Sequence, residues 1–202
     1  MTLGRVAPVR LPRRSSVDAL VLAGGRSRRF GSDKRLARLG RDELVRNAVR
    51  RVRQAVDGRV FVATGRRRER LPGTASTIVV ADRPAGKGPL GGIAAALELA
   101  AVGVVVLACD VPRVRPATLR RLAAVGRRLD RPVAVRGGRG WEPLVAYYPA
   151  WMLNHVRAAI RAGALAPHRL LDACAAVALA ASPQELGNVN TTADLAAMSG
   201  ER

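Results

Sequence analysis

The feature that most constrains this chain is a short apolar run that ends in two glycines. Ala19–Leu22 predicts a buried strand, and Ala23, Gly24 and Gly25 follow it directly. Glycine lets the backbone turn sharply and brings its N–H groups close to an anion. The helix predicted to follow would add its dipole at the same place. The segment therefore predicts a phosphate-binding turn, with positive charge supplied by Arg28, Arg29 and Lys34.

Two common phosphate-loop patterns do not fit this turn. The GxxxxGK[ST] pattern requires Ser or Thr after its lysine, whereas Arg35 follows Lys34. The GxGxxG pattern requires a different spacing of glycines. Both patterns are therefore excluded.

Short apolar runs alternate with helical patterns along most of the chain. The runs rich in β-branched residues predict buried strands at Ala19–Leu22, Val60–Val62, Thr77–Val80, Val104–Ala108 and Val133–Val135. Helical patterns lie between them at Asp33–Val56, Leu90–Ala101 and Pro116–Leu129. This alternation predicts an α/β fold in which a mostly parallel, Rossmann-like sheet lies between two helical layers.

The last third of the chain is less regular. It predicts strands at Leu144–Tyr148 and Val177–Leu179, and helices at Ala150–Ala162, His168–Ala175 and Thr191–Met198. In open α/β sheets, ligands bind outside the carboxyl ends of the strands. Polar segments follow several of the predicted strands, so we expect one cleft lined by the glycine turn, Ala81-Asp82, Cys109-Asp110 and Gly187–Thr191.

The charge of the chain bears on its partners. A formal net charge of +20 suggests a nucleic acid or an anionic membrane. However, only two of the 35 basic residues are lysines, and the arginines are scattered through helices and loops, as compositional bias across a genome would produce. Aromatic residues, which stack on bases, make up only 3% of the chain. No specific nucleic-acid binding and no membrane partner are therefore expected.

A basic protein that binds nucleic acid without catalysis is the alternative class of function. Asp82 and Asp110 at predicted strand ends argue against it, because carboxylates repel backbone phosphates unless a metal ion lies between them.

Length and composition favour one domain. A chain of 202 residues with 49% hydrophobic residues can bury one sizeable core, expected over residues 17–202. Residues 1–16 are basic, contain prolines and lack an apolar stretch, so we expect a disordered arm rather than a secretory signal. Cys109 and Cys174 form no CxxC pattern, which favours a cytoplasmic protein. A monomer is favoured, although the sequence does not determine the oligomeric state.

The segment from Leu22 to Lys34, LAGGRSRRFGSDK, resembles the LAGGxSxRMGxDK signature of the MobA-like nucleotidyltransferase family, which includes molybdenum cofactor guanylyltransferase. Phe30 replaces the methionine of the signature. Further segments resemble motifs of this family in the family's order, and the resemblance extends from Val17 to Met198. They are Asp82–Gly92, Cys109–Pro112, Trp141–Leu144, in which Glu142 replaces His or Gln, and Asn188–Thr191.

This resemblance implies a nucleotide-diphospho-sugar transferase type of fold and a reaction. GMP would pass from GTP to the phosphate of molybdenum-molybdopterin, with release of pyrophosphate. The implied catalytic residues are Lys34, Arg28 and Asp110. The implied nucleotide-binding residues are Leu22, Ala23, Gly24, Gly25, Arg29, Lys34, Asp82, Gly88, Pro89 and Leu90. Mg²⁺ would be held by Asp110 and Asn190, and the guanine base by Asp82.

Each of these assignments has an alternative. Asp110 suits Mg²⁺ because it is a hard oxygen ligand at a strand end, but it could instead be a helix cap or a turn residue. Asp82 could be a solvated loop residue beside Arg83. Glu142 would repel a phosphorylated acceptor unless an arginine neutralised it.

The reaction also has alternatives within the same class, namely cytidylyl transfer to the same acceptor and guanylyl transfer to another small phosphorylated acceptor. Phe30 supports the cytidylyl enzymes, in which RFG is common. Leu22–Gly25 and the GPLGG segment at Gly88–Gly92 oppose them.

Overall fold

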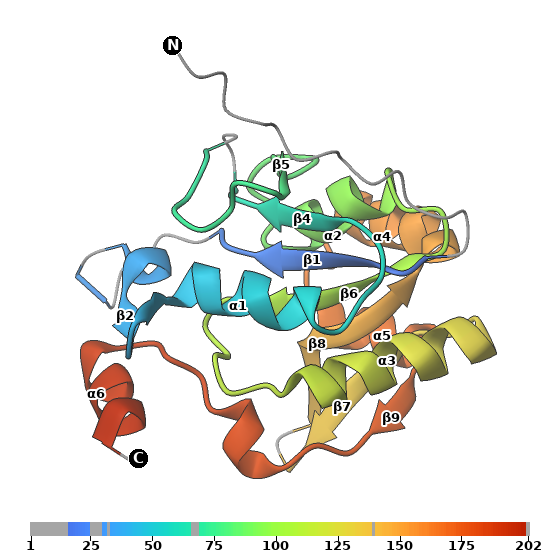
Figure 1. Cartoon of the computed structure of the whole chain (residues 1–202). Coiled ribbons are helices and arrows are strands. Elements are labelled where there is room, and N and C mark those ends of the chain that lie inside the picture. The colour runs from blue at the N-terminus through green and yellow to red at the C-terminus, as the bar shows by residue number, and fades with distance from the viewer. Residues whose placement is uncertain (1–15, 25–29, 32, 66–68, 139, 201–202) are drawn as a thin grey trace.

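The computed structural model describes residues 16–24, 30–31, 33–65, 69–138 and 140–200 (Figure 1). Most of the expected N-terminal arm, residues 1–15, lies outside this part of the chain. Three residues expected at the phosphate-binding turn, Gly25, Arg28 and Arg29, also lie outside it.

A seven-stranded sheet forms the centre of the molecule, in the order β5-β4-β1-β6-β8-β7-β9. Its strands are β1 (Asp18–Leu22), β4 (Val60–Ala63), β5 (Ile78–Val80), β6 (Gly103–Ala108), β7 (Val133–Gly137), β8 (Gly140–Pro149) and β9 (Val177–Leu179). All neighbouring strands of this sheet pair in parallel except β8, which is antiparallel to both β6 and β7. The prediction of a mostly parallel sheet is confirmed.

Helices cover both faces of the sheet (Figure 1). The helices α1 (Leu44–Arg53) and α3 (Pro116–Leu129) pack on one face, around a core that includes Val49, Val105 and Leu122. The helices α2 (Pro89–Leu97), α4 (Leu153–Arg161) and α5 (Pro167–Ala173) pack on the other, around Phe61 and Ile93. The three-layer α/β/α architecture is therefore confirmed.

The single helix expected at Asp33–Val56 is wrong in its first half. The structure has a 3₁₀ turn, η1 (Lys34–Leu36), then a hairpin of β2 (Arg38–Leu39) and β3 (Asp42–Glu43), and α1 begins only at Leu44. Gly40 in the hairpin turn has φ +68°, a left-handed conformation that glycine adopts at little cost and that ends any helix. The N-terminus of α1 thus lies beyond η1 and the hairpin, and among the described residues 33–43 no α-helix begins.

The strand predicted at Leu144–Tyr148 is longer than expected. It begins at Gly140, because Glu142 and Trp141 pair with Val135 and Arg136 of β7. The register then shifts, since the next pair along β7 is Ala134 with Ala146. The residues between form a bulge, a feature that redirects side chains beside many binding sites.

The remaining short elements differ only slightly from the prediction. A 3₁₀ turn, η2 (Ala150–Met152), precedes α4, and another, η3 (Pro183–Leu186), follows β9. The last helix, α6 (Thr192–Gly200), corresponds to the one expected at Thr191–Met198.

A small third core joins the glycine segment to the C-terminal tail. Phe30, Leu44 and Val189 are buried together, with Leu195 and Met198 of α6 packed against them. Figure 1 places α6 beside β2, as this cluster requires. Phe30 is only 7% exposed, so core packing accounts for the aromatic residue at this position.

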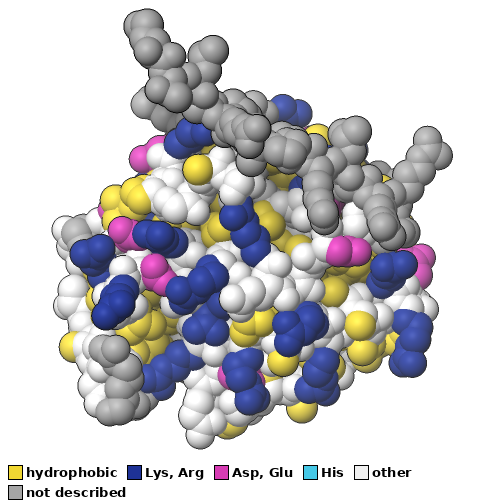
Figure 2. Space-filling view, in the orientation of Figure 1, with side chains coloured by type: hydrophobic (Ala, Val, Ile, Leu, Met, Phe, Trp, Pro, Cys, Tyr) yellow, Lys and Arg dark blue, Asp and Glu magenta, His cyan; other side chains and the backbone are white. Residues whose placement is uncertain are grey.

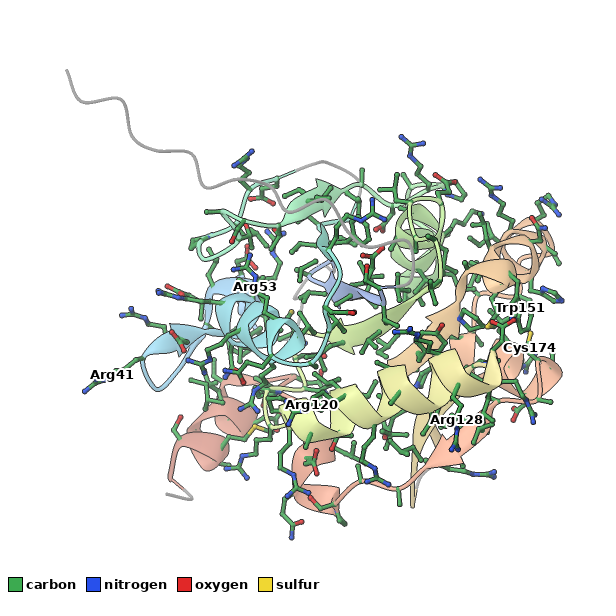
Figure 3. The ribbon with its side chains drawn as sticks, turned by 45° about the vertical axis from the view of Figure 1, so that its right-hand side comes forward. Arg41, Arg53, Arg120, Arg128, Trp151 and Cys174 are labelled. Carbon is green, nitrogen blue, oxygen red and sulfur yellow. The ribbon has the colours of Figure 1, made fainter. Side chains whose placement is uncertain are left out.

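Basic side chains are spread over the surface. On the face seen in Figure 2 they are interspersed with acidic and apolar side chains and do not form a single stripe. Figure 3 shows Arg41 projecting from the hairpin, Arg53 from α1, and Arg120 and Arg128 from α3. Within the described ranges, no helix is both long and apolar enough to span a membrane.

Candidate active site

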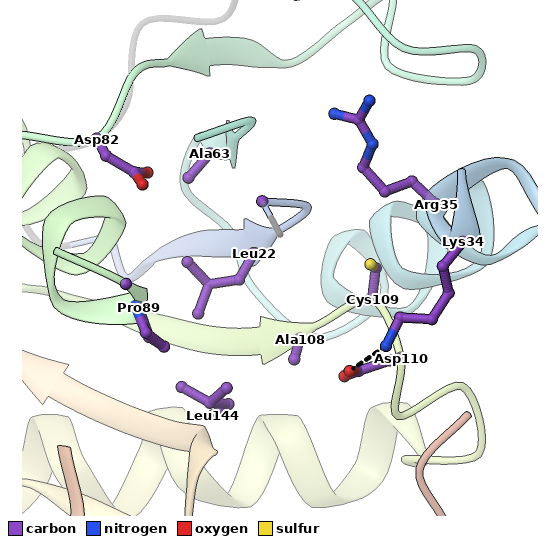
Figure 4. A pocket seen from close by; sticks show the side chains of 12 residues that line it. Leu22, Lys34, Arg35, Ala63, Asp82, Pro89, Ala108, Cys109, Asp110 and Leu144 are labelled. Atoms are coloured by element: carbon purple, nitrogen blue, oxygen red, sulfur yellow. Dashed lines mark hydrogen bonds and ion pairs between the residues drawn. The ribbon is translucent and has the colours of Figure 1, made fainter. Parts of the chain in front are cut away.

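A cleft of about 330 Å³ lies at the carboxyl ends of the parallel strands (Figure 4). Most of the residues expected at the site are in its wall, and Arg35, Ala63 and Ala108 are among the additional ones. The lining residues are Leu22, Gly24, Lys34, Arg35, Ala63, Asp82, Gly88, Pro89, Ala108, Cys109, Asp110 and Leu144. Ala23 and Leu90, also expected here, do not line the cleft and are fully buried beside it.

One end of the cleft is charged. The ammonium group of Lys34 donates to Asp110 Oδ2 at 2.8 Å and to Asn190 Oδ1 at 3.4 Å. The Val189 N–H donates to the Asp110 carbonyl at 2.8 Å, which holds the C-terminal tail against the end of β6. Three segments that are distant in the sequence therefore meet at Lys34, as the strand-end argument predicted.

The turn that carries Asn190 is fixed by a residue that the sequence reasoning missed. Asp194 accepts hydrogen bonds from the N–H groups of Asn190 and Thr191, both at 2.8 Å, and these bonds lower the pKa of Asp194. The Asp194 N–H donates to Thr191 Oγ1 at 3.1 Å. This reciprocal pair resembles a capping box at the start of α6, and Thr191-x-x-Asp194 was its available signal.

The other end of the cleft is apolar around one carboxylate. Asp82 follows β5 and shares this end with Leu22, Ala63 and Pro89. Burial raises the pKa of Asp82, since desolvation disfavours the charged form. Among the described residues, no hydrogen-bond donor reaches the Asp82 carboxylate. The side chain is thus a half-buried acceptor in the wall of the cleft.

Glycines let α2 approach this carboxylate. A Cβ at Gly91 would lie 3.0 Å from the Asp82 Cβ and 2.9 Å from the Pro84 carbonyl oxygen. A Cβ at Gly92 would lie 2.8 Å from a Leu22 methyl group and 2.9 Å from the Ala63 Cβ. At each of the two positions at least one of these distances is under 3.0 Å, which real Cβ atoms essentially never show, so the last two glycines of the GPLGG segment are needed for this packing.

Glycine is also favoured at the glycine turn, where two strand ends pack closely, and before α2, where the backbone has a positive φ. A Cβ at Gly24 would lie 3.2 Å from the Gly65 nitrogen, where the ends of β1 and β4 approach each other. Gly88 precedes α2 with φ +61°, and Pro89 occupies the first helical turn.

Cys109 lines the cleft, but the thiol is not activated. Burial raises its pKa to about 12, and the neighbouring Asp110 charge acts in the same direction. A thiol with this pKa stays protonated at neutral pH, so Cys109 contributes packing rather than a nucleophile.

The charged end suits a divalent ion that is shared with a substrate. Because Asp110 and Asn190 both contact the same Lys34 nitrogen, their oxygens converge on one point. In the part of the chain that the structure describes, no three His, Cys, Asp or Glu side chains gather as a metal site. Mg²⁺ commonly takes one or two protein carboxylates and completes its shell with substrate phosphates, so these residues fit Mg²⁺.

The Trp141–Leu144 segment is divided by the bulge in β8. Leu144 lines the cleft, whereas Glu142 does not. Trp141 donates its indole N–H to Asp172 Oδ1 at 2.6 Å, and the Arg136 guanidinium lies 5.0 Å from the centre of its ring. Trp141 is thus held on the α5 side of the sheet.

Comparisons with known proteins agree with this geometry. A family model described as MobA-like NTP transferase domain matches residues 19–181. Molybdenum cofactor guanylyltransferase of Pseudomonas aeruginosa is 38% identical over 177 residues, which cover 85% of this chain and 89% of that protein.

Two solved structures share the fold. Molybdopterin-guanine dinucleotide biosynthesis protein A of Archaeoglobus fulgidus has a TM-score of 0.76 at 23% identity, covering 91% of this chain and 97% of that one. A Mycobacterium tuberculosis protein in complex with manganese has a TM-score of 0.66 at 21% identity, with the same coverage of 91% and 97%. With the family model and the sequence identity, they lead to one conclusion: this chain belongs to the MobA-like NTP transferase family.

Proposed function

We propose that this protein transfers GMP from GTP to the phosphate of a molybdopterin-type acceptor and releases pyrophosphate. The observation that carries the proposal is a single cleft whose two ends differ in their charged groups. A half-buried carboxylate, Asp82, lies at one end, and Lys34 with Asp110 lies at the other. The relatives named molybdenum cofactor guanylyltransferase support the same reaction.

Asp82 would select the base. Guanine presents a ring N–H and an exocyclic amine side by side, and a carboxylate can accept from both. Adenine and cytosine lack this pair of donors, so either base would cover the half-buried carboxylate without pairing it, which is costly.

Lys34 would bind the triphosphate. Its ammonium group lies beside Asp110 and Asn190 at the charged end of the cleft, so phosphate oxygens bound next to it would meet fixed positive charge. Asp110 and Asn190 would hold Mg²⁺, which when bound neutralises charge on the triphosphate oxygens. Gly24, which lines the cleft, lets the backbone approach the nucleotide closely. Gly25, Arg28 and Arg29 stay predicted phosphate ligands.

The transfer itself needs no side-chain base. An oxygen of the acceptor phosphate, already anionic, forms a bond to the α-phosphorus of GTP. The bond from that phosphorus to the pyrophosphate oxygen breaks, and pyrophosphate leaves with the electron pair. The protein contributes positioning and electrostatic stabilisation, which supply most of the catalysis in phosphoryl-transfer enzymes.

The test is to incubate the protein with GTP, CTP or ATP, with Mg²⁺ and with phosphorylated acceptors that include molybdopterin, and to measure pyrophosphate release. We expect release that requires both GTP and the molybdopterin-type acceptor, together with a dinucleotide product. Release with CTP at an equal rate, or only with a different acceptor, would contradict the proposal.

A further inference from the structure

Arg35 lines the cleft, yet its guanidinium group is already engaged by the protein. Its Nε and Nη2 atoms donate to the two carboxylate oxygens of Asp33 at 2.8 and 2.6 Å. Nη2 also donates to Glu69 Oε2 at 3.1 Å, and Nη1 donates to the Ala23 carbonyl at 3.4 Å. The side chain is 15% exposed. One guanidinium therefore connects three segments around the mouth of the cleft.

These contacts make Arg35 a poor phosphate ligand. Two carboxylates balance its single charge, and the bond to Asp33 is the main reason why the pKa of Arg35 is raised. To bind the Arg35 guanidinium, a phosphate would have to displace the carboxylate of Asp33 from a bidentate ion pair, which is a strong geometry for arginine. The charge that faces the cleft for phosphate binding therefore belongs to the neighbouring lysine.

Lys34 and Arg35 extend in opposite directions from one short 3₁₀ turn (Figure 4). Asp33 caps this turn by accepting the Arg35 N–H at 3.0 Å, and the same carboxylate receives the Arg35 side chain. A turn of three residues has little rigidity of its own. The Asp33–Arg35 pair thus fixes the backbone from which Lys34 reaches Asp110.

The remaining contacts attach this turn to the cleft wall. Ala23 follows β1 at the start of the glycine turn, and Glu69 lies between β4 and β5, where its N–H donates to Thr64 Oγ1 at 3.3 Å. Arg35 therefore ties the turn that carries Lys34 to the ends of two adjacent strands.

We infer that Arg35 is a positioning residue, which sets the place of Lys34 for triphosphate binding without contacting phosphate itself. The inference rests on the proposed function only in taking Lys34 as a phosphate-binding group. It assigns a role to a residue outside the motif that ends at Lys34.

A double-mutant cycle tests this inference. GTP affinity is measured by calorimetry for the wild type, Arg35→Met, Lys34→Ala and the double variant. We expect Arg35→Met to weaken binding about tenfold in the wild-type background and less than about twofold when Lys34 is already alanine, because the second change then has nothing to position. If the fold-losses in GTP affinity of the two single variants multiply in the double variant, Arg35 contacts phosphate independently of Lys34 and the inference is overturned. Unchanged GTP affinity in Arg35→Met would also overturn it.

Three further variants complete the design. Asp33→Asn should reproduce the loss, and Arg35→Lys should not restore binding, because an ammonium cannot form the two-pronged pair. Arg38→Met, at an exposed arginine of β2, should bind GTP like the wild type. An equal loss in Arg38→Met would indicate a general effect of charge and overturn the inference.

Two measurements separate this test from other failures. Thermal melts identify any variant that does not fold, and Glu69→Gln then replaces Arg35→Met in the cycle, because it removes one charged partner at an exposed site. The cycle is repeated with CTP and with inorganic triphosphate. Non-additivity with all three ligands supports the positioning role even if the guanine preference fails, whereas additivity with inorganic triphosphate overturns it.

Discussion

The two ends of the cleft hold their carboxylates in opposite ways. Asp110 is paired with Lys34 at 2.8 Å, and its side chain is 28% exposed. Asp82 lies in an apolar wall, and burial raises its pKa. The first carboxylate sits beside the charge that compensates it, whereas the second carries a desolvation cost that only a ligand with suitable donors would relieve. Substitutions at the two positions should therefore differ in kind.

The largest effect is expected at the charged end. Asp110→Asn keeps the shape of the side chain and removes the charge proposed to hold Mg²⁺, so Mg²⁺-dependent pyrophosphate release should fall by far more than tenfold, with the fold retained. Asp130→Asn is a matched control, because Asp130 is exposed at the end of α3 in a left-handed conformation that asparagine accepts. Activity of Asp110→Asn above about a tenth of wild type, a loss of less than 1.4 kcal/mol, would remove Asp110 from the site.

A smaller and more selective effect is expected at the apolar end. Asp82→Ala should reduce the preference for GTP over CTP by about 1.5–3 kcal/mol, the range for a hydrogen bond to a charged group. Turnover at saturating nucleotide should change much less, since the phosphates are held elsewhere. The measurement is kcat/KM for both nucleotides in the wild type and the variant. An unchanged ratio would make Asp82 a solvated loop residue.

Most of the architecture could be predicted from local patterns. The strand-end rule brought residues 22–24, Asp82, Asp110 and Asn190 to one edge, because buried β-branched runs such as Val104–Ala108 are unambiguous. The hairpin before α1 was missed, although Gly40 inside the expected helix was a signal for a turn in the sequence.

The sequence predicted the edge at which distant segments meet, but not the individual side-chain contacts between them. The hydrogen bonds of the Arg35 side chain require Ala23 and Glu69 as neighbours. No pattern of residue spacing in the sequence predicts that these residues lie close together. The contacts of Phe30 were likewise not predictable. Its identity suggested a cytidylyl enzyme, but it packs in a buried cluster with Leu44 and Val189, which explains a large apolar residue at this position. The Thr191–Asp194 box, by contrast, is local and could have been found.

Stability should respond differently to the loss of charge at the two ends. Asp82→Asn removes a desolvated charge, so it should raise Tm at pH 7. Asp110→Asn loses an ion pair and should not raise Tm.

The difference in Tm between Asp82→Asn and the wild type should depend on pH in a definite direction. Because the pKa of Asp82 is raised on folding from its ordinary 3.8, the folded state binds the proton more readily than the unfolded state. The cost of the charge is therefore present above the raised pKa and disappears as the pH falls through it. The advantage of Asp82→Asn in thermal melts should shrink toward pH 4. A larger Tm difference in acid, or no difference at pH 7, would contradict the conclusion that the Asp82 carboxylate is desolvated.

The smallest effect is expected at Phe30. Phe30→Met keeps a large apolar side chain in the cluster with Leu44 and Val189, so the ratio of kcat/KM for GTP and CTP should change by less than about twofold. A clear shift toward either nucleotide would link this core to base selection and restore the cytidylyl argument.

The most direct test is competition between GTP and CTP for the wild-type protein, measured by calorimetry in the presence of Mg²⁺. If the half-buried carboxylate of Asp82 selects the base while Lys34 and Asp110 bind the phosphates, GTP should bind at least about tenfold more tightly than CTP, and Asp82→Ala should remove most of that difference. Equal affinity for the two nucleotides in the wild type would contradict the guanylyl assignment, and the cytidylyl alternative would replace it.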